Sequence, residues 1–269
     1  TSKQSLPEFL QENGVVAIEG IDTRALTMHL RDYGAQKAAI STEDLDPAHL
    51  LARVQASPNI SEHNFVPDVS VDAPHVVPAT SKKRFNVVAY DCGEKNGILQ
   101  GLAANGCEVT VVPWSTPAED ALAYNPDGIF FSNGPGDPST ADREIGVLRA
   151  VLDAGIPYFG ICFGHQLFGR ALGYGTYKLD YGHRGINQPV KDVATGRVEI
   201  TAHNHGFAVD APVGEPSVAP FDSGRYGRVE VSHIGLNDGV VEGLRALDIP
   251  AFSVQYHPEA AAGPHDGEL

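Results

Sequence analysis

Four nearly continuous apolar runs, separated by segments of helical pattern, dominate the middle of this 269-residue sequence. Near-continuous apolar strands joined by helices are typical of a parallel sheet that is covered on both faces. We therefore predict an α/β fold with a mostly parallel sheet and helices on both faces. The predicted strands are residues 85–90, 108–112, 128–131 and 157–161.

The segments between these runs predict helices. One follows the first strand and extends through Leu102, and the spacing of Ile145, Leu148 and Leu152 places them on one face of another. From about residue 174 the apolar segments become shorter and alternate, which indicates added antiparallel strands.

The pattern changes along the chain and predicts three parts. Residues 1–65 are mixed helical and extended, and they read as the remnant of a smaller N-terminal domain. Residues 66–84 contain Pro67, Pro74 and Pro78 with little apolar periodicity, so a linker is expected there. Residues 85–269 form the predicted α/β domain.

Within residues 1–65 the sequence predicts three short elements. A short amphipathic helix opens at Leu6, and the apolar run Val15–Ile18 is expected to be a strand. A second helix is expected from Thr23 through Leu30, with Asp22 or Thr23 as its N-cap.

Composition excludes several classes of protein. The chain has 34 acidic and 19 basic residues and a formal net charge of −15, so nucleic acid and anionic membranes are not expected as partners. No apolar run has the length of a membrane span, and the amino terminus does not resemble a signal peptide. The three cysteines are too few and too irregularly spaced for a disulfide framework, so a cytoplasmic protein is expected.

The strongest local signal surrounds Cys162, which stands between glycines in the run Gly160–Gln166 at a predicted strand-to-helix junction. A nucleophile on such a sharp turn needs small neighbours because its backbone is strained. The N-terminus of the following helix favours a thiolate and offers N–H groups to an oxyanion. The alternative, a buried structural cysteine, is disfavoured by the flanking glycines, whereas Cys107 reads as core.

A thiol nucleophile needs a base and a group that orients the base. His257 ends an extended segment, and Glu259 follows two residues later on the same side of an extended chain. Alone, His-Pro-Glu is a weak motif that also fits an ordinary turn. Together with Cys162 it predicts a catalytic set of Cys162, His257 and Glu259.

Other motifs are less specific. The glycines of Gly134–Pro138 let a ligand approach the backbone or simply form a turn, and Asn204–Phe207 lines a pocket or forms a turn. No Gly-Lys-Ser/Thr follows a glycine-rich loop, so no ATP site is expected on this chain. We predict no metal site, because His203 and His205 lack a companion ligand pattern.

Taken together, these motifs resemble the class I glutamine amidotransferases, and most closely the small, glutaminase subunit of carbamoyl-phosphate synthase. The resemblance covers nearly the whole chain. Beyond the catalytic motifs, it rests on the stretches 133–138, 182–185, 187–192 and 204–210, on Ile21–Thr27 and on Gly263–Asp266. Phe163 stands where the family usually has leucine.

The resemblance implies roles for individual residues. Cys162 would attack the glutamine side-chain amide and form a glutamyl thioester, with His257 transferring protons and Glu259 orienting it. The backbone at Gly136 and Phe163 would form the oxyanion hole. The glutamine-binding set would comprise Gly134, Gly136, Phe163, Gln166, Asn204, Gly206 and Phe207.

The resemblance also implies a partner. Ammonia would pass to a large ATP-binding subunit that makes carbamoyl phosphate from bicarbonate, for arginine and pyrimidine biosynthesis, in a heterodimer. ATP and Mg²⁺ are expected on that subunit, and no cofactor is expected on this chain. The upstream part of the family's N-terminal domain and its C-terminal helix lie outside this sequence.

Three alternatives stay open at the level of sequence. Another class I glutaminase, serving GMP or anthranilate synthesis, is disfavoured by Ile21–Thr27 and Gly263–Asp266. A cysteine peptidase or γ-glutamyl hydrolase would be separated by comparing glutamine with small peptides as substrates. A non-enzymatic binding module is disfavoured because all three catalytic residue types are present.

Overall fold

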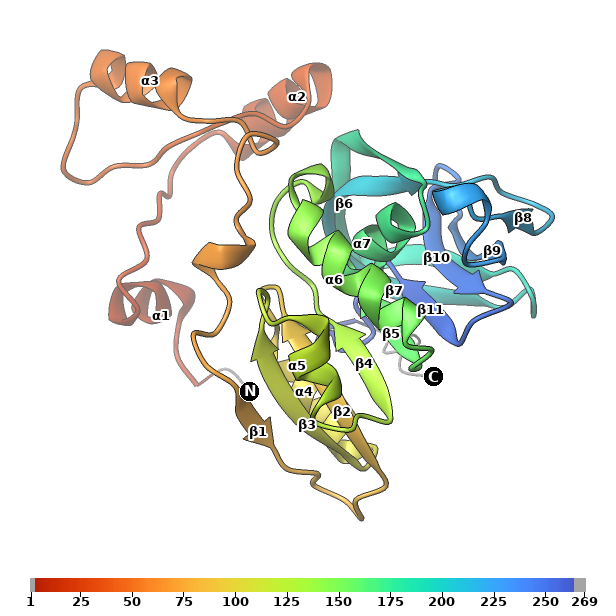
Figure 1. Ribbon diagram of the computed structural model, residues 1–269. Coiled ribbons are helices and arrows are strands. Elements are labelled where there is room, and N and C mark those ends of the chain that lie inside the picture. The colour runs from red at the N-terminus through yellow and green to blue at the C-terminus, as the bar shows by residue number, and fades with distance from the viewer. Residues whose placement is uncertain (1–2, 264–269) are drawn as a thin grey trace. The chain divides into compact units, whose positions relative to one another are not determined.

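The computed structural model describes residues 3–263. The chain divides into two compact units, Thr1–Asn59 and Ile60–Leu269 (Figure 1). No helix in the described residues is both long and apolar enough to cross a membrane. The expected motif at Pro264–Asp266 lies outside these residues.

The first unit contains the helices α1 (Leu6–Glu12), α2 (Thr23–Tyr33) and α3 (Pro47–Ala56). Ser5 and Glu8 form a reciprocal capping box at the start of α1. The Asp22 side chain accepts a hydrogen bond from the backbone N–H of Ala25 at the start of α2. The two helices predicted in this part are therefore confirmed, and α3 is additional.

The predicted strand Val15–Ile18 is wrong. These residues form no strand, and the described residues 3–59 contain none. An apolar run becomes a strand only when a neighbouring strand satisfies its backbone groups. The side chains of Val15, Val16 and Ile18 are about half exposed instead.

The second unit is built on an eleven-stranded sheet of order β1-β3-β2-β4-β5-β11-β10-β7-β6-β9-β8 (Figure 1). Strands β3, β2, β4, β5 and β11 are parallel, whereas β1 and the strands beyond β11 pair antiparallel. Both the parallel core and the antiparallel addition are thus confirmed. The strands are β1 (His75–Val77), β2 (Phe85–Asp91), β3 (Cys107–Pro113), β4 (Gly128–Phe131), β5 (Tyr158–Ile161), β6 (Gly175–Asp192), β7 (Val198–Asp210), β8 (Ser217–Val218), β9 (Arg228–Gly235), β10 (Val241–Ala246) and β11 (Ala251–Val254).

Helices cover both faces of the parallel part. Alternate residues of β2 point to opposite sides, so that Val88 and Tyr90 join one apolar cluster and Ala89 joins the other. The first cluster includes residues of α5, α6 and α7, and the second includes Ile98 of α4. The helices are α4 (Asn96–Ala104), α5 (Ala118–Leu122), α6 (Asp142–Asp153) and α7 (Phe163–Ala171), with short 3₁₀ turns η1 (Val66–Asp68), η2 (Pro138–Thr140) and η3 (Phe221–Ser223).

The segment 66–84 carries structure of its own. Val66 in η1 is fully buried, and β1 pairs with β3 at the edge of the sheet. The chain divides after Asn59, so this segment belongs to the second compact unit. The domain boundaries at residues 65 and 84 stay a prediction.

The parallel strands bring several chain segments to one edge of the sheet. Phe131 at the end of β4 pairs with Gly160 of β5, and Ile161 at the end of β5 pairs with Val254 at the end of β11. The segments that follow these strand ends therefore meet at the carboxyl edge, where open α/β sheets form their sites.

Candidate active site

Cys162 lies between the end of β5 and the start of α7, in a conformation that is rare for a residue with a side chain. Its backbone has φ 54° and ψ −100°. Hydrogen bonds hold this turn, because its N–H donates to the carbonyl of Val254 at 2.9 Å and its carbonyl accepts from the N–H of Gln166 at 3.1 Å. Strain of this kind costs about 1–3 kcal/mol and persists only where the surroundings enforce it.

The glycines on either side of Cys162 are required by close contacts. A Cβ on Gly164 would collide with the backbone carbonyl of Phe131, and a Cβ on Gly160 would lie 2.8 Å from the carbonyl carbon of Gly164. The turn is therefore packed backbone against backbone, as predicted for a nucleophile at a strand-to-helix junction.

His257 and Glu259 lie beside Cys162. The Nδ1 of His257 lies 2.7 Å from Oε1 of Glu259, and the ring also hydrogen-bonds the Cys162 side chain. Because Nδ1 donates to the carboxylate, Nε2 is left to face the sulfur. The side chains of His257 and Glu259 are only 4% and 5% exposed, so the pair is protected from water.

The electrostatics of this triad favour a charged imidazole. Burial by itself lowers the pKa of His257, but the attraction and hydrogen bond of Cys162 and the bond to Glu259 outweigh it and raise the pKa to about 9. Burial by itself raises the pKa of Glu259. Its bond to His257 and the nearby Lys95 outweigh burial and bring this pKa below its usual value. The arrangement can therefore hold a thiolate–imidazolium pair.

Two residues near the triad were missed by the sequence analysis. Nζ of Lys95 lies 3.4 Å from Oε1 of Glu259 and 3.2 Å from Nδ1 of His257. Since that nitrogen already donates to Glu259, we read the lysine as a partner of the carboxylate. Burial, with Asp91 and Glu259 nearby, raises the pKa of Glu94 to about 8. Both follow the end of β2, and the rule that sites form at strand ends could have identified them.

The predicted oxyanion groups come from two loops. Phe163 is the first residue of α7, where a helix has no internal partner for its N–H. Gly136 follows β4 with φ 94°, a conformation that favours glycine, and faces Phe65. Gly134 packs against the backbone carbonyl of Cys92. Their contact with a substrate stays a prediction.

The other predicted glutamine-binding residues lie on α7 and β7. Nε2 of Gln166 donates to the backbone carbonyl of Phe207 at 2.9 Å and contacts Oε1 of Gln255 at 3.0 Å. This amide nitrogen is thus engaged in holding Phe207. Asn204 is exposed and Gly206 is partly exposed on β7. Their roles in binding glutamine also stay predictions.

Two protein-family models match the chain. The class-I glutamine amidotransferase model matches residues 88–269, and the CPSase-domain model of the carbamoyl-phosphate synthase small chain matches residues 1–40. The first match includes Cys162, His257 and Glu259, and the second lies within the first compact unit.

Curated relatives are similar to this chain over nearly its whole length. The carbamoyl phosphate synthase small chain of Streptomyces avermitilis is 57% identical over 98% of this chain and 69% of its own length. The protein of the same name from Bifidobacterium longum is 53% identical over 97% of this chain and 68% of its own length. A Thermoplasma acidophilum protein named for GMP synthase shares the fold, with a TM-score of 0.57 at 17% identity over 70% of this chain and 91% of that one.

We expect the pKa of His257 to depend on Cys162. In Cys162→Ala the attraction that raises this pKa is lost while burial remains, so the pKa should fall below about 9, as measured by NMR titration of the imidazole. In the unaltered chain, the raised pKa of His257 stabilises the folded state. This stabilisation is fully present below pH 6.5, the ordinary pKa of histidine, and is lost as pH rises through about 9. Cys107→Ala is the matched control, and an unchanged pKa in Cys162→Ala would contradict the pairing.

Proposed function

Because the chain belongs to the carbamoyl-phosphate synthase small-chain family of class-I glutamine amidotransferases, we propose that it hydrolyses L-glutamine through a Cys162 thioester. The ammonia passes to a large synthetase subunit that makes carbamoyl phosphate from bicarbonate and ATP. The observation that carries this proposal is the strained Cys162 turn, hydrogen-bonded to the buried His257.

The reaction begins with the thiolate of Cys162. Its sulfur attacks the side-chain amide carbon of glutamine, a C–S bond forms, and the amide oxygen becomes an oxyanion. The backbone N–H of Phe163 and the Gly136 loop stabilise that charge. The intermediate then collapses, the C–N bond breaks, and the leaving nitrogen takes a proton from Nε2 of His257 and departs as ammonia.

The second half of the reaction regenerates the enzyme. His257 is now neutral and takes a proton from water, whose oxygen attacks the thioester carbon. The C–S bond breaks, glutamate leaves, and the thiolate–imidazolium pair returns. Glu259 holds Nδ1 protonated throughout, so that Nε2 is the nitrogen that exchanges the proton.

Substrate contacts are proposed for the loops around the sulfur. Gly134 and Gly136 let the glutamine lie close to the backbone after β4, and Asn204 and Gly206 offer polar backbone groups on β7. Gln166 acts mainly by holding the carbonyl of Phe207, since its amide nitrogen is 2.9 Å from that oxygen. A shift of Phe207 would therefore change glutamine binding before it changed the chemistry at sulfur.

The large subunit is proposed to dock on the first compact unit. This unit exposes large apolar side chains, and exposed apolar patches mark interaction surfaces. The most exposed include Leu6, Tyr33, Leu45 and Leu51, each with more than half of its surface accessible. ATP and Mg²⁺ would bind the large subunit, and carbamoyl phosphate would supply arginine and pyrimidine biosynthesis in the cytoplasm.

We expect Cys162→Ala and Cys162→Ser to abolish glutamine hydrolysis, because the attacking thiolate is lost. The full complex containing either variant should still make carbamoyl phosphate from added ammonia. Cys107→Ser, which alters a cysteine remote from His257 and Glu259, is the control and should retain glutaminase activity. Normal glutamine hydrolysis by Cys162→Ala would disprove the mechanism.

Loss of His257 should cost more than loss of Glu259. His257→Asn removes the proton carrier and should lower kcat by about 10²–10⁴-fold, the usual contribution of general acid–base catalysis. Glu259→Gln keeps a hydrogen-bonding side chain but removes the charge, so a smaller loss is expected. Steady-state glutaminase kinetics measure both, and full activity in His257→Asn would require a different base.

The glutaminase rate should depend on the large subunit. We expect the chain alone to hydrolyse glutamine slowly, because docking of the large subunit orders the loops around Gly136 and Phe207. We also expect it to bind no ATP, because its sequence has no phosphate-binding loop motif. Kinetics with and without the large subunit, and ATP titration of the chain alone, measure this. A full rate without the large subunit, or stoichiometric ATP binding, would overturn the proposed division of labour between the two chains.

A further inference from the structure

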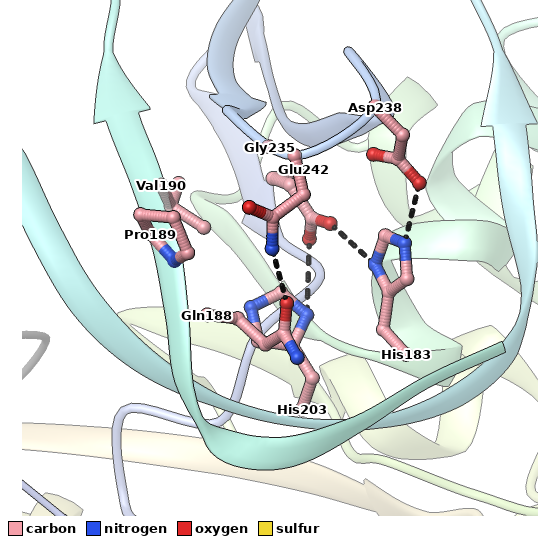
Figure 2. Close-up of a pocket in the computed structure, with 9 residues that line it drawn as sticks. His183, Gln188, Pro189, Val190, His203, Gly235, Asp238 and Glu242 are labelled. Carbon is pink, nitrogen blue, oxygen red and sulfur yellow. Dashed lines mark hydrogen bonds and ion pairs between the residues drawn. The ribbon is translucent and has the colours of Figure 1, made fainter.

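A second cluster of polar side chains takes no part in the chemistry described above. His183 of β6, His203 and His205 of β7 and Glu242 of β10 converge so that one ligand-type atom from each lies within 4.8 Å of all the others. His203, His205 and Glu242 are buried. Figure 2 shows contacts running from the Glu242 carboxylate to both His183 and His203.

The strands explain this convergence. His203 and His205 are two residues apart on β7, so their side chains lie on the same face of the sheet. His183 pairs directly with His205 in the β6–β7 ladder, and β10 pairs with β7 nearby. Three neighbouring strands thus direct their side chains to one point, which spacing along the sequence does not reveal.

The outer nitrogens of the three imidazoles are all engaged as donors. Nδ1 of His205 donates to the carbonyl of Phe207 at 2.9 Å. Nε2 of His183 lies 2.8 Å from the carboxylate of Asp238. A histidine that binds a metal usually donates its other ring N–H to a carboxylate or carbonyl in this way.

The third imidazole, His203, is fixed by a hydroxyl with a single hydrogen. Oγ1 of Thr201 donates to the carbonyl of Gln188 at 2.9 Å and lies 2.7 Å from Nε2 of His203. We assign the only hydrogen of this hydroxyl to the bond with Gln188, so that the hydroxyl accepts from Nε2 of His203. Nδ1 of neutral His203 therefore carries a lone pair.

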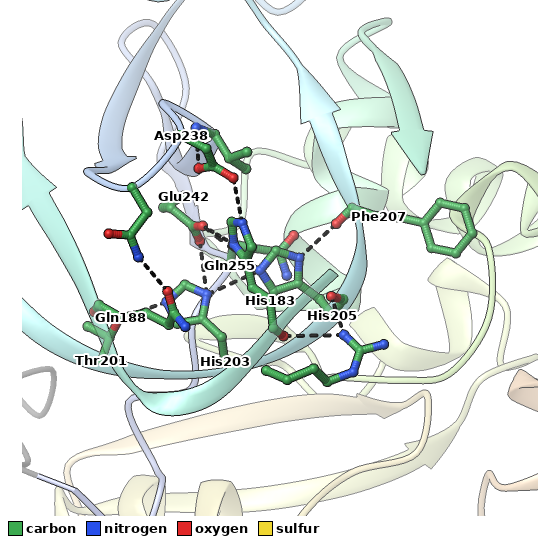
Figure 3. Close-up of polar contacts among 12 residues, drawn as sticks. His183, Gln188, Thr201, His203, His205, Phe207, Asp238, Glu242 and Gln255 are labelled. Atoms are coloured by element: carbon green, nitrogen blue, oxygen red, sulfur yellow. Dashed lines mark hydrogen bonds and ion pairs between the residues drawn. The ribbon is translucent and has the colours of Figure 1, made fainter. Parts of the chain in front are cut away.

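The inner atoms of the cluster converge on one another (Figure 3), and in this assignment they are acceptors as long as the imidazoles are neutral. Nδ1 of His203 and Nε2 of His205 face each other at 3.1 Å with no hydrogen between them. The carboxylate oxygens of Glu242 lie 3.6 Å from the former and 3.9 Å from the latter, and 3.2 Å from Nδ1 of His183. A positive charge is needed where these lone pairs meet.

Protons supply this charge poorly. Oε2 of Glu242 has no hydrogen-bond partner among the described residues, and 3.6 Å to His203 is too long for it to donate. A proton on His183 would still leave the contact between Nδ1 of His203 and Nε2 of His205 without a donor.

We propose that His183, His203, His205 and Glu242 bind one divalent transition-metal ion of the zinc type. Three imidazoles and a carboxylate suit Zn²⁺, whereas Mg²⁺ and Ca²⁺ prefer oxygen ligands. With metal–ligand bonds of about 2.0–2.1 Å, a tetrahedral site has ligand atoms about 3.3 Å apart. The shortest separations here, 3.1 and 3.2 Å, are close to this spacing, and all four ligand atoms lie within 4.8 Å of one another. A cavity of about 10 Å³ lined by three of these ligands, His183, His203 and Glu242, lies beside the cluster.

The ion has a structural role. Four protein ligands complete a tetrahedral zinc shell, so no coordination position is left for a substrate. The site joins β6, β7 and β10, and two backbone hydrogen bonds tie these strands to the active site. The N–H of His257 donates to Ala202 at 2.9 Å, and the N–H of Gln255 donates to Glu242 at 2.8 Å. The ion therefore fixes the strands that hold His257 and Phe207.

Zinc titration of the chelator-treated chain tests the proposal. The Cys162→Ser background removes the thiolate, which is a competing zinc ligand. Competition with a chromogenic chelator should show one Zn²⁺ per chain, with an accompanying rise in Tm. Thr201→Val removes only the hydroxyl that orients His203 and should weaken binding by about 10–100-fold. His203→Gln and Glu242→Gln remove ligands and should weaken binding further.

His75→Gln is the matched control, because His75 is exposed on β1 and should leave zinc affinity unchanged. Cobalt provides a readout that needs no variant at the cluster, since Co²⁺ in a four-coordinate site absorbs strongly in the visible. Equal zinc affinity in His203→Gln and in the parent chain would overturn the proposal. A cobalt spectrum of six-coordinate type would overturn it even if the ligand variants failed to fold.

Discussion

The backbone of Cys162 is the constraint on which the rest of the site depends. A left-handed residue with a side chain is unfavourable by itself, so the surroundings must hold it. They do so from both neighbouring strands, because Val254 of β11 accepts from the Cys162 N–H and Ser132 after β4 accepts from the Gly164 N–H at 3.1 Å. The parallel sheet is thus the device that makes the strained turn possible, and the buried helix α7 keeps the turn from relaxing.

The same sheet brings His257, the proposed base, to Cys162, the proposed nucleophile. Because β5 and β11 are parallel neighbours in register, the chain leaves both at the same edge, and His257 follows β11 by three residues. The antiparallel strands fix the position of His257, since its N–H donates to the backbone carbonyl of Ala202 on β7. A displacement of β7 would therefore move the imidazole and the Phe207 carbonyl together, which couples the proton carrier to the substrate loop.

Sequence patterns predicted what depends on contacts close along the chain. The bounds of β4 were predicted as observed, because a short apolar run between turn residues favours a strand in a covered sheet. The glycine-flanked turn at Cys162 was predictable because its strain is local. Val15–Ile18 was predicted wrongly, because such a run needs a partner strand, and none pairs with it in the described residues. Contacts that depend on strand order could not be predicted. Glu242 becomes a neighbour of His203 only through the pairing of β10 with β7 and β9. Lys95, which follows β2, contacts Glu259, which follows β11.

Glu94 shows how the site's charge is kept balanced. In the proposed mechanism, the thiolate–imidazolium pair, Glu259 and Lys95 together carry no net charge. Burial raises the pKa of Glu94 to about 8 from an ordinary 4.5, so near neutral pH it adds no charge to this balance. The folded state keeps that proton while the unfolded chain releases it, so the group lowers stability as pH rises from 4.5 towards 8. A charged Glu94 would instead place a further buried negative charge near Asp91 and Glu259. The stability that Glu94 costs is therefore lost beside the candidate site, where its neutral form avoids repulsion with Glu259.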